Sequence, residues 1–240
     1  MAPLASPLAV DDPLFLPLVA AVAAWLGFFL LQRWARPELV YWLSEAEADQ
    51  ILARPAVWRI LAFLAAALEV LVVSALQGPP SLASSLAMGV LTAALLLAAM
   101  VDLRCRLLPD RITWLLVGVG LVAALLGLSV PLGEALLGGV IGYCLPWLLA
   151  MVSRKRRRLR SDADPLPMGR GDFALIAGLG VWLGFSNLPL VLVLASLGML
   201  PIAAWGLMRN QWRLSTALPF GPALSFSGLV MLPWTGFGLG

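Results

Sequence analysis

The sequence has no histidine, only two cysteines and few charged residues. The absence of histidine removes the commonest metal ligand and general base. Cys105 and Cys144 are far apart and unaccompanied, so we expect two free thiols and neither a disulfide nor a metal site. Lys, Arg, Asp and Glu make up 12% of the chain, which is about half of the fraction usual in a soluble domain. These shortages exclude a globule with a water-facing surface.

Long apolar runs take the place of the missing charge. Hydrophobic residues make up 61% of the 240 residues, and a helix needs about 20 apolar residues to cross a bilayer. We therefore expect an all-α polytopic membrane protein, a single domain over residues 1–240 with about eight transmembrane helices. The expected spans are residues 14–31, 56–76, 82–101, 112–128, 133–152, 172–185, 188–208 and 218–237.

The basic residues divide cleanly between the connections. All sixteen Lys and Arg residues fall in alternate connections or just beside them, so the positive-inside rule predicts that both termini are non-cytoplasmic and the charged loops cytoplasmic. The loop at residues 32–55 suggests a short amphipathic helix along the inner membrane face. The loop at residues 153–171 carries a basic run, 154–160, which we expect to bind anionic lipid head groups. A nucleic-acid partner is not expected for a loop so close to the bilayer.

Two acidic residues fall at cytoplasmic ends of expected spans. Asp102 ends the third span and Asp172 begins the sixth, so the predicted topology puts both at one depth, and they can meet if the two helices are neighbours. Two carboxylates held close together cannot both ionise, so one keeps a proton while the other takes one from a water that attacks a carbonyl. This is the requirement of an aspartic hydrolase. Gly169 and Gly171 would let the backbone approach a bound peptide closely.

The same residues also have simpler explanations. An acid in the first turn of a helix acts as a cap worth about 1 kcal/mol, and both Asp110 and Asp172 fit that description. Asp102 fits it less well, but it could pair with a nearby arginine. Glu69 lies well inside the second span, where an acid is either a functional group or a hydrogen-bond partner of a neighbouring helix. Spacing alone leaves these alternatives open.

Three short motifs occur in a particular order. The residues concerned are Asp102 with Pro109-Asp110, then Gly169-Arg170-Gly171-Asp172, then Pro219-Phe220-Gly221-Pro222. They resemble the motifs of the type IV prepilin peptidases, membrane aspartic endopeptidases of the Gly-x-Gly-Asp type. The resemblance covers roughly the C-terminal two thirds of the chain.

The resemblance implies a function and a set of roles. The function is removal of the short basic leader from prepilin or pseudopilin precursors at the cytoplasmic face of the bacterial inner membrane, in pilus assembly, protein secretion or competence. The partners would be the substrate helix and membrane lipids, and proteolysis would need neither a metal nor a cofactor. Asp102 and Asp172 match the catalytic pair. The supporting positions are Pro109, Asp110, Gly169, Gly171 and Glu69.

The chain departs from the family pattern at two places. Larger members carry a zinc-binding cytoplasmic domain with two Cys-x-x-Cys pairs after the first span, whereas residues 32–55 contain no cysteine. Larger members also N-methylate the new pilin terminus with S-adenosylmethionine. No feature of the sequence establishes or excludes that activity, and the shortened loop weighs against it. The residue two positions after the second-motif Asp is commonly Lys in the family, but here it is Ala174.

Two other classes of protein compete with the peptidase hypothesis. A small secondary transporter or channel could use Glu69, Asp102 and Asp172 as proton or cation sites, although the sequence has no evident inverted repeat. An inactive scaffold within a pilus or secretion assembly would use the acids as helix caps only.

Overall fold

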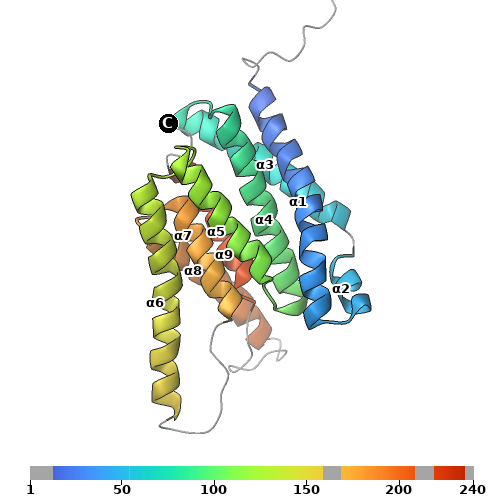
Figure 1. Cartoon of the computed structure of the whole chain (residues 1–240), viewed down its shortest axis with the longest axis vertical. Coiled ribbons are helices and arrows are strands. Elements are labelled where there is room, and N and C mark those ends of the chain that lie inside the picture. Colours follow the sequence, from blue (N-terminus) through green and yellow to red (C-terminus); the bar gives the residue numbers. More distant parts are fainter. Residues whose placement is uncertain (1–12, 54, 159–168, 209–218, 236–240) are drawn as a thin grey trace, which may run out of the picture.

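The computed structural model describes residues 13–53, 55–158, 169–208 and 219–235, and these ranges contain helices and short connections without a strand. The predicted all-α class is confirmed. The helices are arranged as an elongated bundle (Figure 1). They are α1 (Phe15–Trp42), α2 (Glu45–Ile51), α3 (Pro55–Gln77), α4 (Leu82–Cys105), α5 (Asp110–Leu125), α6 (Leu132–Arg158), α7 (Arg170–Leu183), α8 (Leu188–Met208), α9 (Gly221–Met231) and the 3-10 turn η1 (Leu232–Trp234).

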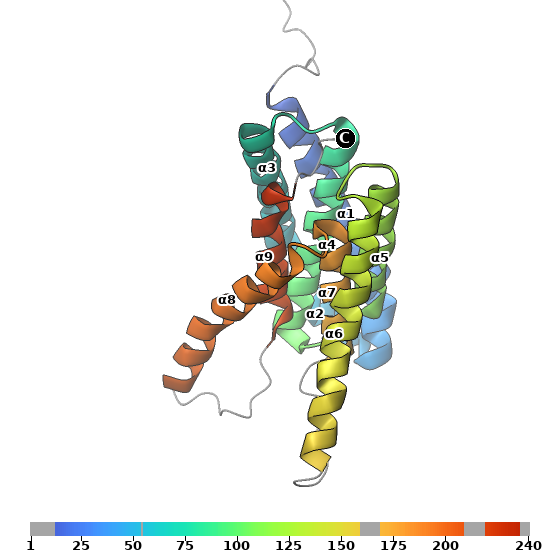
Figure 2. The ribbon, with the colours of Figure 1, turned by 90° about the vertical axis from the view of Figure 1, so that its left-hand side faces the viewer.

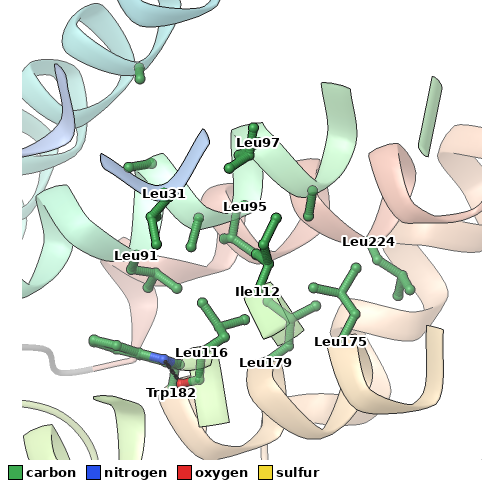
Figure 3. Packing of buried hydrophobic residues seen from close by; sticks show 14 of the residues in the cluster. Leu31, Leu91, Leu95, Leu97, Ile112, Leu116, Leu175, Leu179, Trp182 and Leu224 are labelled. Atoms are coloured by element: carbon green, nitrogen blue, oxygen red, sulfur yellow. Dashed lines mark hydrogen bonds between the residues drawn. The ribbon is translucent and has the colours of Figure 1, made fainter. Parts of the chain in front are cut away.

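Helix α4 forms the centre of the bundle. It contacts α1, α3, α5 and α9, and most of its residues are buried. Trp182 of α7 donates a 2.8 Å hydrogen bond from Nε1 to the carbonyl of Leu116 in α5 (Figure 3). Because α4, α5 and α7 share one core, their ends have fixed relative positions. Core residues that Figure 3 shows include Leu91, Leu95, Ile112, Leu116, Leu179 and Leu224.

Helices α6 and α7 touch through their backbones. Gly138 of α6 faces Gly180 of α7, and a Cβ on either glycine would overlap the carbonyl oxygen of the other. Small residues permit such close approach between membrane helices, where packing replaces the hydrophobic effect as the driving force. The contact holds α7 against α6.

The apolar character of the helices confirms a polytopic membrane protein. In the described part of the chain, α1, α3, α4 and α6 are long and apolar enough to cross a bilayer. Large exposed side chains such as Leu64, Leu68 and Val140 cover outward faces of α3 and α6, as lipid contact requires. Helices α5, α7 and α9 contain 16, 14 and 11 residues. The number of eight spans therefore stays a prediction, as does the side of the termini, because residues 1–12 and 236–240 lie outside the described ranges.

The first helix is longer than predicted. It was expected to end at residue 31 but continues to Trp42. Leu31, Ala35 and Leu39 recur every fourth residue and are all buried, so the packed stripe holds the helix together although Pro37 lacks a backbone donor. The short helix predicted in the following loop is confirmed as α2.

Helix α2 is attached to the end of α4. Arg104 of α4 donates hydrogen bonds to the carbonyls of Gln50 and Ile51 and, at 2.8 Å, to that of Ala53. These carbonyls lie at the C-terminus of α2, where a helix leaves acceptors unsatisfied. Figures 1 and 2 place α2, the end of α4 and the starts of α5 and α7 at the same end of the bundle.

Two further predictions concern side chains outside the core. Cys105 and Cys144 are free thiols, as expected. The basic run at residues 154–160 was predicted to bind lipid, but its side chains lie outside the described residues.

Candidate active site

Asp102 lies in the last turn of α4 and is only 5% exposed. The helix ends there because Arg106 adopts a left-handed conformation with φ of 55°, a common way to terminate a helix. The Oδ2 atom of Asp102 accepts a 2.9 Å hydrogen bond from the backbone N–H of Gly221, the first residue of α9. A buried carboxylate is costly without such a partner. The third sequence motif therefore supplies a donor to the acid of the first.

Asp172 lies in the first turn of α7 and is partly buried. Its Oδ2 atom accepts a 3.2 Å hydrogen bond from the backbone N–H of Gly169, which precedes the helix. The positive end of the helix dipole also favours a carboxylate at this position. Asp172 is therefore a helix cap, which was one of the predicted alternatives.

The structure brings the two aspartates together at one end of the bundle. The end of α4 and the start of α7 lie at the same level (Figure 2), and the negative charge of Asp102 acts on Asp172. Neighbouring carboxylates resist carrying two negative charges at once. Among the described residues, no cluster of three or more Cys, Asp or Glu side chains could hold a metal ion.

Gly171 joins the first and second motifs by close packing. A Cβ at Gly171 would lie 2.5 Å from Cβ of Leu108 and 3.0 Å from its carbonyl oxygen. Leu108 precedes Pro109, which is buried and is the N-cap residue of α5. The absence of a side chain at position 171 therefore sets the spacing between the connection after α4 and the start of α7.

Glu38, which lies within the loop predicted at residues 32–55, positions the first motif. Its two carboxylate oxygens accept hydrogen bonds from the backbone N–H groups of Asp110, at 2.8 Å, and Arg111, at 3.1 Å. These are orphan donors of the first turn of α5. The Asp110 side chain itself is exposed. The sequence held no signal for the contact, because Glu38 lies on α1 and only the fold brings it to α5.

Glu38→Ala is expected to lower the free energy of unfolding by about 0.5–2 kcal/mol, the range for a lost helix cap. The first turn of α5 would lose two acceptors, so the segment next to Asp102 would loosen. Thermal unfolding of the detergent-solubilised protein measures the change. Glu45→Ala, at an exposed glutamate of α2, is the matched control. Equal melting temperatures for the two variants would contradict the positioning role.

Gly221→Ala is expected to impair the site with little effect on the rest of the fold. The added Cβ would lie 2.8 Å from Oδ2 and 3.1 Å from Cβ of Asp102, so the carboxylate must move. Misplacement of a reacting group by about 1 Å costs roughly 100-fold in rate. Gly118→Ala on α5, where nothing lies within 4 Å of the new Cβ, should keep its activity. The measurement is the rate of cleavage of the prepilin precursors that the resemblance implies, and an unchanged rate for Gly221→Ala would count against the role of this contact.

Glu69 does not join the aspartates. It is 6% exposed within α3, and Thr92 Oγ1 lies 2.6 Å from its Oε2. Thr92 precedes Asp102 by ten residues on α4, which is about 15 Å along a helix. The other carboxylate oxygen of Glu69, Oε1, is buried and has no hydrogen-bond partner in the described part of the chain. Glu69 therefore forms a separate polar contact between α3 and α4.

A cavity of about 390 Å³ lies beside the start of α7. Aromatic rings form much of its wall, and Tyr143 contacts both Trp114 and Phe173, with ring centres 5.8 and 6.3 Å apart. Ala174 lines this cavity, so the family lysine at that position would project toward the same space. Charged groups on its wall come from Asp110 and Arg170.

The fold and the site together define a helical membrane protein with a pair of neighbouring aspartates at one end of its bundle. Residues 89–204, which include Asp102 and Asp172, match the Type IV leader peptidase family. The match confirms the resemblance inferred from the motifs, and this part of the chain is similar to that family.

Relatives agree with this assignment. The chain is 40% identical over 151 residues to a prepilin leader peptidase/N-methyltransferase of Aeromonas salmonicida, covering 62% of this chain and 50% of the relative. Identity is 37% over 183 residues with the protein of that name from Pectobacterium carotovorum, covering 75% and 59%. For the Neisseria gonorrhoeae protein it is 37% over 143 residues, covering 59% and 46%. The chain thus spans about half the length of the curated relatives it matches. No solved structure matches the chain significantly.

Proposed function

We propose that this chain is a membrane aspartic endopeptidase that removes the leader from type IV prepilin or pseudopilin-like precursors. The observation that carries the proposal is the placement of Asp102 and Asp172 at one end of the bundle, where the negative charge of Asp102 acts on Asp172. The choice of substrate is supported by the names of the relatives, which are prepilin leader peptidases.

In the proposed mechanism, water is the only co-reactant. One carboxyl of the pair keeps a proton and the other, as carboxylate, removes a proton from a water held between them. The water oxygen attacks the scissile carbonyl carbon while the protonated partner stabilises the developing oxyanion. Collapse of the tetrahedral species breaks the C–N bond, and a carboxyl proton passes to the leaving amine. Backbone donors at Gly221 and Gly169 hold the two acids in place.

The aromatic cavity beside α7 is the proposed site for part of the precursor. Trp114, Tyr143 and Phe173 offer apolar surface that suits the start of the substrate's apolar helix. Asp110 on the same wall has the charge that suits a basic leader. Arg170 lines the cavity, and Asp172 follows it by two residues. A peptide bound in the cavity could therefore extend to the Asp102/Asp172 pair.

The topology proposed for the enzyme is a single domain with eight spans and both termini outside the cytoplasm. Its support is that all sixteen basic residues lie in alternate connections or just beside them, as the positive-inside rule requires. The Asp102/Asp172 pair would then face the cytoplasmic side of the bacterial inner membrane. The proposal is limited to proteolysis. The relatives' names also include N-methyltransferase, and S-adenosylmethionine use by this chain is left to experiment.

The test is co-expression of the full chain with tagged prepilins and pseudopilins. Leader removal appears as a mobility shift, and mass spectrometry of the new N-terminus locates the cleaved bond and reports any methylation. Processing that requires the chain supports the proposal. If no precursor is processed, the proposal fails. Proton or cation flux in liposomes that depends on Glu69, Asp102 or Asp172 would then favour a transporter, and the absence of flux would favour a scaffold.

A further inference from the structure

A second charged cavity, of about 240 Å³, lies between α1, α2 and the start of α3. It is separate from the aromatic cavity, and no step of the proposed proteolysis uses it. Three arginines line it, namely Arg33 and Arg36 of α1 and Arg59 of α3, together with Phe29 and Asp49. We refer to it as the arginine cavity.

Its lining carries an excess of positive charge. Arg36 donates hydrogen bonds of 2.8 and 3.1 Å to the two carboxylate oxygens of Asp49, and the hydrogen bond from Arg36 lowers the pKa of Asp49. That pair neutralises itself. Among the described residues, no carboxylate lies within ion-pair distance of Arg33 or Arg59. Two guanidinium charges therefore remain for an anion.

Aromatic rings hold these two guanidinium groups in place. Arg33 lies 4.6 Å from the ring centre of Phe29, and Arg59 lies 5.5 and 5.6 Å from those of Trp25 and Phe29. Stacking of this kind orients an arginine without consuming its hydrogen-bond donors. The buried Nε of Arg59 has no acceptor in the described part of the chain, and such a donor is costly to leave unpaired.

Two features of the surroundings select the kind of anion. Pro55 at the start of α3 also lines the cavity, so the positive end of that helix dipole adds to the field. From the cavity, α1 carries an exposed apolar stripe that includes Leu26, 46% exposed, and Val22, 43% exposed. A free anion would leave this stripe uncovered, whereas the acyl chains of a lipid can lie along it.

We propose that the arginine cavity binds the phosphate group of an anionic phospholipid whose acyl chains lie along α1. Guanidinium groups bind phosphate through paired hydrogen bonds, and basic pockets between transmembrane helices are suited to lipid head groups. The site is distinct from the basic run at residues 154–160 and does not depend on the proposed peptidase activity.

The test is native mass spectrometry of the full-length protein in non-ionic detergent with added phosphatidylglycerol or phosphatidylcholine. Wild type should retain phosphatidylglycerol in preference. Arg33→Gln/Arg59→Gln should weaken that retention by about 10-fold to 100-fold, the range for charge-assisted hydrogen bonds. Arg209→Gln/Arg213→Gln removes the same charge from the connection between the seventh and eighth expected spans and should leave retention at the wild-type level.

Several outcomes would overturn the proposal. They are equal retention of the two lipids, retention unaffected by Arg33→Gln/Arg59→Gln, or loss in the control variant instead. If inorganic phosphate displaced phosphatidylglycerol mole for mole, the site would be one for free phosphate and the lipid proposal would be overturned. If the glutamine variant fails to fold, Arg33→Lys/Arg59→Lys decides the matter. It keeps the charge but loses the paired donors, so unweakened retention would overturn the proposal and weakened retention would support it.

Discussion

Asp102→Asn and Asp172→Asn should each lower leader cleavage by roughly 100-fold to 10,000-fold, the range for loss of a general acid or base. Asparagine has the shape of aspartate and keeps a carbonyl oxygen, so it can still accept the hydrogen bond from Gly221 or Gly169. It cannot take a proton from water. The loss of activity should therefore occur in a protein that still folds, which size-exclusion chromatography and thermal unfolding can check.

A double variant sharpens this test. Because the two acids act as one unit, Asp102→Asn/Asp172→Asn should be hardly less active than either single variant. Glu45→Gln is the control, because this exposed glutamate lies on α2 and does not line the aromatic cavity. Cleavage that survives at Asp102→Asn or Asp172→Asn would eliminate the aspartic mechanism, whatever the fate of the control.

Gly138→Ala should cause the largest loss of stability among single substitutions in the glycine contacts described. The new Cβ would overlap the carbonyl oxygen of Gly180, and a backbone cannot move aside as a side chain can. Overpacking costs about 1–3 kcal/mol and occasionally more, and backbone contact places this site at the upper end. Helix α7 would be displaced from α6, and Asp172 would move with it.

Gly133→Ala provides a matched comparison for that experiment. Both glycines lie on α6, but nothing lies within 4 Å of a Cβ at Gly133. Removal of a helical glycine is itself favourable by about 1 kcal/mol, so Gly133→Ala should melt at or above the wild-type temperature. Gly138→Ala should melt well below it and lose cleavage activity. Similar melting temperatures for the two variants would mean that α6 and α7 do not pack through these glycines.

Helix class and the positions of the acids could be predicted from sequence because they depend on local patterns. Apolar run length identifies membrane helices, and the split of basic residues places Asp102 and Asp172 at one end. The extension of α1 to Trp42 was missed because Arg33, Arg36 and Pro37 resemble a polar connection. Its cause, the burial of an apolar stripe, is a tertiary effect.

The partners of the acids could not be predicted, because each comes from a distant part of the chain. Glu38 meets Asp110, and Gly221 meets Asp102, only after α1, α5 and α9 have packed around α4. The segment containing Gly221 was noted as a motif, yet its role as a donor appears only in three dimensions. The arginine cavity likewise depends on α1 and α3 being adjacent.

The hydrogen bonds from Arg104 to the end of α2 couple two parts of the molecule mechanically. Arg104 follows Asp102 by two residues on α4, and it grips the carbonyls of Gln50, Ile51 and Ala53. If the end of α4 moved outward, these carbonyls would lose their hydrogen-bond donor. The connection between α1 and α3 therefore restrains the end of α4. A displacement of this connection would therefore be transmitted through Arg104 to Asp102.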